Sequence, residues 1–229
     1  MGRRVQSGGA GGSEGIHVSE PTLTTYAAGG PAEAVVLMLH GGKPRSRQPV
    51  DRRSASWRRS EWMARSIAAK AHAAEAHVWL LRYRERGWNG GRDRIEDARW
   101  SLDAVRTAHG DVPVVLLGHS MGARVAVHVA DDPSVVGVVG LAPWWAAEDP
   151  VSTLSGRALV AAHGRRDRIT SFAETTRYVE RAKGIATAVE LVDMGALGHY
   201  MLTGVEAWNT VASTSALQLL RLHQDARDS

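Results

Sequence analysis

The chain has 229 residues, enough for one domain with a substantial core. With 44% hydrophobic and 23% charged residues, it has the composition of an ordinary globular protein. It contains no cysteine, which excludes disulfides, thiolate catalysis and cysteine-ligated metals. No segment approaches the roughly 18 apolar residues of a membrane helix, and residues 1–15 lack the apolar run of a secretory signal. A cytoplasmic location is therefore the expectation.

The formal net charge is +4, and nearly all the basic residues are arginines. This bias favours a solvated basic surface over nucleic-acid binding, because no aromatic interleaving or nucleic-acid motif accompanies it. One cluster is dense enough to attract an anionic substrate or partner if it borders a site. Its members are Arg45, Arg47, Arg52, Arg53, Arg58 and Arg59.

The first half of the chain starts with a Gly/Ser-rich segment over residues 1–15, which we expect to be disordered. Short β-favouring pieces follow at 16–19 and 23–26. A continuous apolar run predicts a buried strand at 34–39, before His40, Gly41 and Gly42. After the arginine cluster, apolar residues at helical spacing predict a helix from about Ser56, with that serine as N-cap.

The remaining elements alternate regularly. Strands are predicted at 77–84, at 112–117, from near 135, from near 158 and at 187–194. Helices are predicted at 94–110, after the strand at 112–117 to about 130, at 171–183 and at 204–223. Apolar strands separated by amphipathic helices predict the α/β class: a mostly parallel central sheet with helices on both faces. We see one domain, spanning 16–229.

One motif suggests chemistry. Ser120 lies between Gly118 and Gly122, where an apolar strand turns sharply into a helix. A plain connection needs glycines but no hydroxyl, so the spacing G-x-S-x-G in this setting indicates that the serine is presented to a substrate.

Other functional groups follow the neighbouring predicted strands. Asp167 comes after the strand at 158–162, and His199 after the strand at 187–194. Because carboxyl ends of parallel strands meet at one edge of a sheet, these side chains are expected near Ser120. A serine needs a base to take its proton, imidazole suits that role, and a carboxylate orients the imidazole. The N–H groups of Met121, at a helix start, and of Gly42 are candidate oxyanion donors.

These residues resemble the α/β-hydrolase superfamily over about residues 20–225. "GHSMG" is similar to its nucleophile elbow, "LHGG" to its oxyanion strand end, and the order Ser, Asp, His to its triad. The resemblance implies Ser120 as nucleophile, Asp167 as acid and His199 as base, with Gly42 and Met121 as oxyanion hole. The loop "HGGKP" departs from the longer HGGG pattern of some esterases.

Several residues compete for these roles. Glu148 and Asp149 follow the preceding strand, where some hydrolases place the acid, and Asp193 lies close to a strand. The competing histidines are His40, His119 and His163. We expect His119 to point away from the site and the other two to brace loops.

The tryptophans Trp144 and Trp145 end the strand after the serine helix and either line the substrate pocket or pack against the last helix. Between Trp145 and Arg157 there are too few residues for a cap domain, so we expect a lidless site. No H-E-x-x-H or similar spacing suggests a metal, and no cofactor is implied.

The resulting interpretation is a serine hydrolase that cleaves an ester, thioester or related acyl bond of a small molecule through an acyl-enzyme on Ser120. The alternatives are an acyltransferase with the same triad and a non-catalytic hydrolase-like binding protein.

Overall fold

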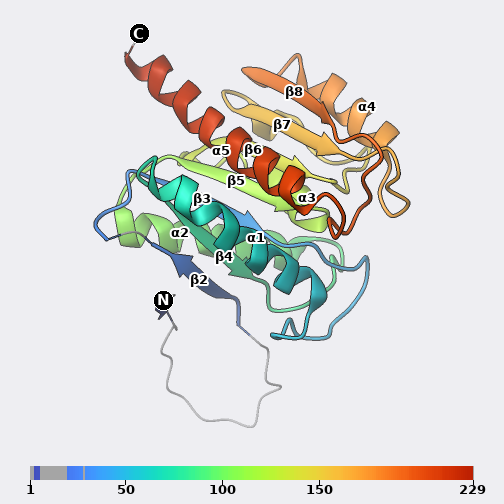
Figure 1. Cartoon of the computed structure of the whole chain (residues 1–229), viewed down its shortest axis with the longest axis horizontal. Helices are drawn as coiled ribbons and strands as arrows, with labels where there is room; N and C mark the ends of the chain where they lie inside the picture. Colours follow the sequence, from blue (N-terminus) through green and yellow to red (C-terminus); the bar gives the residue numbers. More distant parts are fainter. Residues whose placement is uncertain (1–2, 6–19, 28, 229) are drawn as a thin grey trace.

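A central eight-stranded sheet organises the protein, as the computed structural model shows in Figure 1. The model describes residues 3–5, 20–27 and 29–228. The strand order is β1-β2-β4-β3-β5-β6-β7-β8; β2 pairs antiparallel with β1 and β4, and all later neighbours pair parallel. The strands are β1 Arg3–Val5, β2 Thr22–Tyr26, β3 Ala34–Leu39, β4 Ala76–Arg82, β5 Val114–His119, β6 Val135–Leu141, β7 Ala158–His163 and β8 Ala188–Asp193.

The hydrophobic pattern explains the position of each strand. All six residues of β3 and all six of β5 are buried, as required of central parallel strands covered on both faces. In β8, at the edge of the sheet, exposed and partly buried residues are mixed. The continuous apolar runs therefore form the centre of the sheet.

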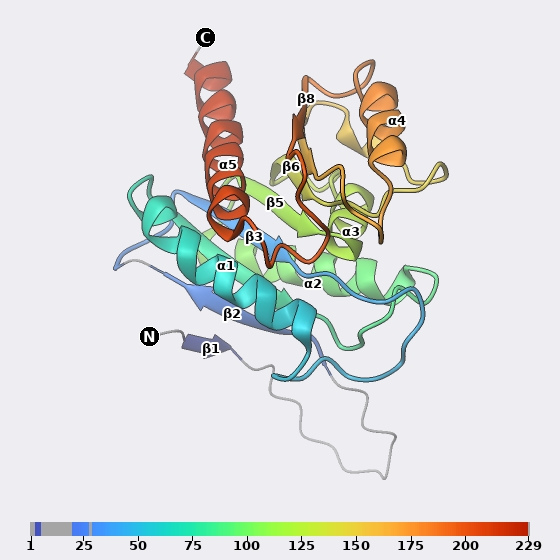
Figure 2. The same ribbon diagram turned by 45° about the vertical axis from the view of Figure 1, so that its right-hand side comes forward.

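Helices cover both faces of the sheet (Figure 2). α1 and α5 pack against each other on one face, while α2, α3 and α4 lie on the other. The α-helices are α1 Ala55–His72, α2 Arg92–His109, α3 Met121–His128, α4 Phe172–Ala182 and α5 Val205–Asp228. This confirms the α/β class with a mostly parallel sheet.

The N-terminal region differs in part from the prediction. Residues 3–5, inside the segment expected to be disordered, form β1, because the open edge of β2 offers unpaired backbone groups to a further strand. The rest of that tail and the strand predicted at 16–19 lie outside the described residues.

The start of α1 also differs. The helix begins at Ala55, and its N-cap is Ser54 instead of Ser56. The Ser54 hydroxyl makes no capping bond. It donates to Asp51 Oδ1 at 2.9 Å, which closes the turn before the helix.

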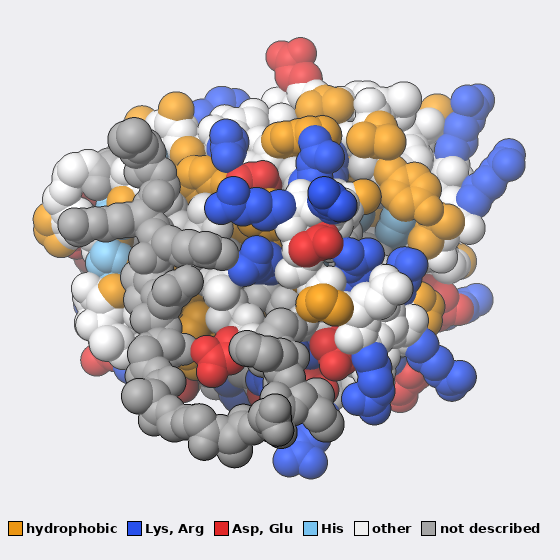
Figure 3. All heavy atoms as spheres, turned by 90° about the horizontal axis from the view of Figure 1, so that it is seen from below, with side chains coloured by type: hydrophobic (Ala, Val, Ile, Leu, Met, Phe, Trp, Pro, Cys, Tyr) orange, Lys and Arg blue, Asp and Glu red, His pale blue; other side chains and the backbone are white. Residues whose placement is uncertain are grey.

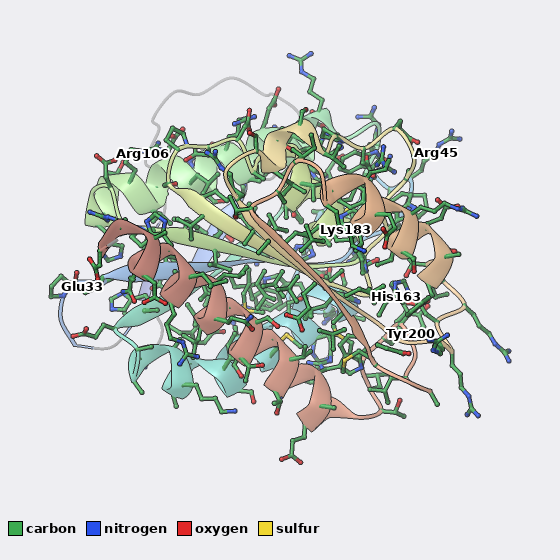
Figure 4. All side chains as sticks on the ribbon, turned by 90° about the horizontal axis from the view of Figure 1, so that it is seen from above. Glu33, Arg45, Arg106, His163, Lys183 and Tyr200 are labelled. Atoms are coloured by element: carbon green, nitrogen blue, oxygen red, sulfur yellow. The ribbon has the colours of Figure 1, made fainter. Side chains whose placement is uncertain are left out.

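No cap domain interrupts the described fold between β6 and β7. That connection contains only a 3-10 helix of three residues, Ser152–Leu154. Figure 4 shows Arg45, His163 and Tyr200 at one end of the strands, with Glu33 and Arg106 at the opposite end. The first of these ends is the carboxyl edge of the sheet, where the candidate residues gather.

Candidate active site

Ser120 occupies the turn between β5 and α3 in a strained conformation, with φ 53° and ψ −115°. A side chain at Gly122 would collide with the backbone of Leu39, and one at Gly118 with the backbone of Ala123, so both flanking positions require glycine. The Ser120 N–H donates to the Leu141 carbonyl at 3.0 Å, which ties the turn to the end of β6. A non-glycine residue held at positive φ by its surroundings is typical of a functional position.

His199 and Asp167 meet at the same edge, from the loops after β8 and β7. His199 Nδ1 lies 2.8 Å from Asp167 Oδ2, and both side chains are almost fully buried. This contact occupies Nδ1 and leaves Nε2 of His199 available. His199 and Ser120 line one cavity.

The Asp167 carboxylate is surrounded by donors. Its Oδ1 accepts from the N–H groups of Ile169 and Thr170 at 2.8 and 2.9 Å. Its Oδ2 also lies 2.8 Å from the Thr170 hydroxyl and 3.2 Å from Nε2 of His163. Burial by itself raises the pKa of Asp167, but the hydrogen bonds from His163, His199 and the two backbone N–H groups outweigh it and hold the pKa well below its usual range. The group is therefore a permanent anion near neutral pH.

His119 does not point away from the site, so that expectation was wrong. Its ring centroid lies 5.0 Å from that of His199, and its Nε2 donates to the His199 carbonyl oxygen at 3.1 Å. The strand register causes this, because His119 is the last residue of β5 and its ring faces the loop that carries His199. Burial and the nearby His199 lower the pKa of His119 to about 3, so the ring is neutral.

The other two histidines do hold loops. His40 Nδ1 contacts the Gly41 carbonyl oxygen at 2.6 Å, while Nε2 accepts from the Tyr83 N–H at 3.3 Å. His163 is buried and its Nδ1 lies 2.7 Å from the Thr175 hydroxyl, which connects β7 to α4.

The cavity that contains Ser120 has a volume of about 150 Å³. It is formed where the loop after β3, the first turn of α1, the serine turn and the loop after β8 come together. Its lining residues are Gly41, Gly42, Ala55, Ser56, Arg59, His119, Ser120, His199, Tyr200 and Leu202.

Gly42 and Met121 lie next to each other at this cavity. A Cβ at Gly42 would collide with the Arg86 carbonyl oxygen and with the Met121 thioether, so only glycine allows the loop to approach so closely. Met121 is the first residue of α3, and its N–H is among those that have no partner within the helix.

The alternative carboxylates have other partners. Asp149 is buried and contacts Arg124 Nε at 2.8 Å and His128 Nε2 at 2.9 Å. Glu148 pairs with the same arginine at 2.7 Å. Asp193 is exposed and pairs with Arg165 at 2.7 Å. Within the described chain, Asp167 is the carboxylate that contacts His199.

Neither predicted pocket tryptophan belongs to the described lining of the Ser120 cavity. Trp145 is a core residue, stacked on Tyr178 with ring centroids 4.3 Å apart, and its indole N–H donates to the Ala123 carbonyl. Trp144 borders a separate surface depression, where Arg124 lies 4.9 Å from its ring centroid. The chain turns away from the cavity after β6, which explains both positions.

The arginine cluster is divided. Arg59 is buried at 6% exposure and lines the Ser120 cavity, whereas Arg58 is exposed and lies 5.3 Å from the ring centroid of Trp62. In Figure 3, Lys and Arg side chains are interspersed with acidic and apolar ones on the face shown. The remaining exposed members are Arg45, Arg47, Arg52 and Arg53.

The described residues contain no group of three or more His, Asp or Glu side chains placed to hold a metal ion. None of the described helices combines the length and apolar character needed to cross a membrane.

Comparison with known proteins identifies the family and the fold. The model of the alpha/beta hydrolase family matches residues 36–225. No curated protein matches the sequence. A solved alpha-beta serine hydrolase homologue from Coxiella burnetii is 15% identical, with 94% of this chain and 96% of that chain covered and a TM-score of 0.67.

Two further structures have the same fold. A serine hydrolase without lid from Xanthomonas campestris is 16% identical, covering 85% of this chain and 87% of that one, with a TM-score of 0.63. Est1E from Butyrivibrio proteoclasticus, solved with ferulic acid, is 9% identical, covering 88% and 96%, with a TM-score of 0.64. Since the family model spans most of the sequence, the chain belongs to the alpha/beta hydrolase family and is a hydrolase.

Proposed function

We propose that the protein is a serine hydrolase that cleaves esters or thioesters of small acyl groups, with Ser120 as nucleophile, His199 as base and Asp167 as the acid that orients it. The observation that carries the proposal is the 2.8 Å contact of Asp167 with His199 Nδ1, beside a strained serine in the same cavity. This contact directs the free Nε2 of His199 to the proton transfer.

We propose the following reaction for these residues. His199 Nε2 takes the Ser120 hydroxyl proton as Oγ bonds to the substrate carbonyl carbon. The N–H groups of Gly42 and Met121 donate to the developing oxyanion. When the carbonyl reforms, the bond to the leaving alcohol or thiol breaks, and His199 gives that group the proton. A water molecule then attacks the carbonyl carbon of the acyl-enzyme while His199 takes a proton from it. The bond between that carbon and Ser120 Oγ breaks, His199 returns the proton to Oγ, and the acid is released.

The volume of the cavity favours a small acyl group in the substrate. About 150 Å³ is the volume that holds a benzene-sized molecule. Tyr200 and Leu202 line it and are 61% and 68% exposed, so they offer apolar surface at the mouth. Short acyl groups therefore fit better than long chains.

The test is covalent labelling by a fluorophosphonate, which reacts with an activated serine. We expect one label, located on Ser120 by peptide mass analysis, and none in Ser120→Ala or after prior reaction with a small acyl ester analogue. Ser213, a buried serine in α5, provides the control: Ser213→Ala should label as the wild type does. A folded wild type that takes no label, or takes it elsewhere, would disprove the mechanism.

A further inference from the structure

Arg59 is a cation built into the wall of the Ser120 cavity. It lies on α1, one turn after Ala55 and Ser56, which line the same cavity. Only 6% of the residue is exposed, unlike its exposed neighbour Arg58. An arginine this deeply buried usually has a carboxylate partner.

The described part of the chain supplies Arg59 with no such partner. Its Nε donates to the Met201 carbonyl at 3.1 Å, while its Nη2 is buried without any hydrogen-bond partner. None of the ion pairs among the described residues includes it. Burial lowers the pKa of Arg59, but a guanidinium keeps its charge at neutral pH. A buried cationic N–H without an acceptor is costly, and an oxygen of a ligand would satisfy it.

The other polar groups of the cavity do not neutralise this charge. His119 is a neutral ring whose Nε2 is engaged and whose Nδ1 has no partner. The Asp167 carboxylate lies behind His199, and both its oxygens accept hydrogen bonds. Among the described residues, Arg59 is the one Lys or Arg side chain that lines the cavity.

We propose that Arg59 determines specificity by binding a carboxylate of the substrate, so that the preferred substrates are esters or thioesters of short acyl groups that carry a second, free carboxylate. This rests on the proposed function of Ser120. Nε is held by Met201 and the buried Nη2 has no partner, so a substrate carboxylate that reaches this guanidinium would satisfy the unpaired N–H, and the planar guanidinium suits the two oxygens of a carboxylate. In a cavity of about 150 Å³, such a group lies only a few bonds from the scissile carbonyl.

Two esters of equal length test the charge alone. Monoethyl succinate ends in a carboxylate, and ethyl levulinate has a methyl ketone in its place. Ethanol release should give the wild type a kcat/KM about tenfold to a hundredfold higher for monoethyl succinate, the range of a hydrogen bond to a charged group. Arg59→Gln should abolish this preference, so that the kcat/KM values of the variant for the two esters become equal. The matched control Arg58→Gln removes an exposed arginine from the same helix and should keep the preference.

A direct binding measurement separates this proposal from the catalytic one. Calorimetry with monoethyl succinate should show a dissociation constant at least tenfold weaker for Ser120→Ala/Arg59→Gln than for Ser120→Ala. Equal constants, or equal loss of kcat/KM for both esters in Arg59→Gln, would overturn the role of Arg59. Fluorophosphonate labelling tests Ser120 independently. Absence of the label would overturn the proposed function and leave the binding result standing.

A second variant, Arg59→Lys, keeps the charge but not the paired N–H groups, and it serves if Arg59→Gln does not fold. It should retain part of the preference for monoethyl succinate. Kinetics of Arg59→Lys equal to those of the wild type would contradict the paired contact.

Discussion

Nε2 of His163 lies 3.2 Å from Asp167 Oδ2, the same oxygen that contacts His199. One carboxylate oxygen is therefore in contact with two imidazole rings. The ring of His199 lines the cavity, and the ring of His163 is fully buried. His163 is fixed in turn by the Thr175 hydroxyl at 2.7 Å. The buried histidine thus holds the carboxylate that, in the proposed mechanism, orients His199.

The first prediction concerns this positioning role. His163→Phe keeps a ring but removes the N–H that binds Asp167, so kcat should fall about tenfold while KM stays the same, because the loss affects an oriented group and not substrate contact. Thr175→Val provides the control: it should lose about 1–3 kcal/mol of stability, as expected when a buried hydrogen bond is broken, yet keep most of kcat. Wild-type kcat in His163→Phe would show that the second imidazole only supports packing.

The second prediction separates the candidate acids. Asp167→Asn should remove most of kcat, since the amide stabilises neither the required tautomer nor the imidazolium of His199. Asp149→Asn should leave kcat nearly intact but lower the melting temperature, because Asp149 pairs with buried Arg124 away from His199. Glu148→Gln and Asp193→Asn should change neither property much. A catalytically dead but folded Asp149→Asn would place the acid after β6 instead of β7.

The third prediction is the pH dependence of stability. Burial lowers the pKa of His40 to about 4 and that of His119 to about 3, from an ordinary 6.5. Below pH 6.5 these two rings are protonated in the unfolded chain but stay neutral in the folded protein. The free energy of unfolding should therefore be highest above pH 6.5 and decrease as the pH falls toward 3.

The variant His40→Gln tests this directly. Urea unfolding at pH 7.5 and pH 5.0 should show a smaller loss of stability in the variant than in the wild type, by about 2 kcal/mol. His223→Gln, a partly buried histidine near the end of α5, serves as the comparison and should change the pH dependence much less. The same slope in His40→Gln and wild type would contradict a neutral His40 in the folded protein.

Much of the architecture could be predicted because it depends on local patterns. The buried runs of β3 and β5 indicate central strands on any reading, and the G-x-S-x-G spacing requires a tight turn whose glycines the structure explains. The approach of Asp167 to His199 followed from one rule, that carboxyl ends of parallel strands share an edge. Their roles in catalysis stay predictions.

The remaining features depend on how elements are rotated and packed, which no local pattern contains. Arg59 and Arg58 are adjacent and chemically identical, and only the orientation of α1 places one in the cavity and the other in solvent. Trp144 and Trp145 were predicted as a pair, yet the turn after β6 sends Trp145 into the core. The ring of His119 faces His199 because of the register of β5, a property of the assembled sheet.

The last prediction concerns how the rate depends on the physical state of the substrate. A lipase that acts at a lipid–water interface commonly opens an apolar lid there, and its rate rises sharply when substrate passes its solubility limit. In the described chain, the β6–β7 connection holds only the three-residue helix Ser152–Leu154, and the mouth of the cavity is already bordered by exposed Tyr200 and Leu202. With no lid to open, the rate should follow the concentration of dissolved ester and level off at the solubility limit. It should also fall as the acyl chain outgrows a cavity of about 150 Å³.

The measurement is the initial rate for ethyl esters of increasing chain length, taken below and above the solubility limit of each. The rate with Ser120→Ala is subtracted as background hydrolysis. A sharp rise at the limit would mean that a segment of this protein moves at an interface after all.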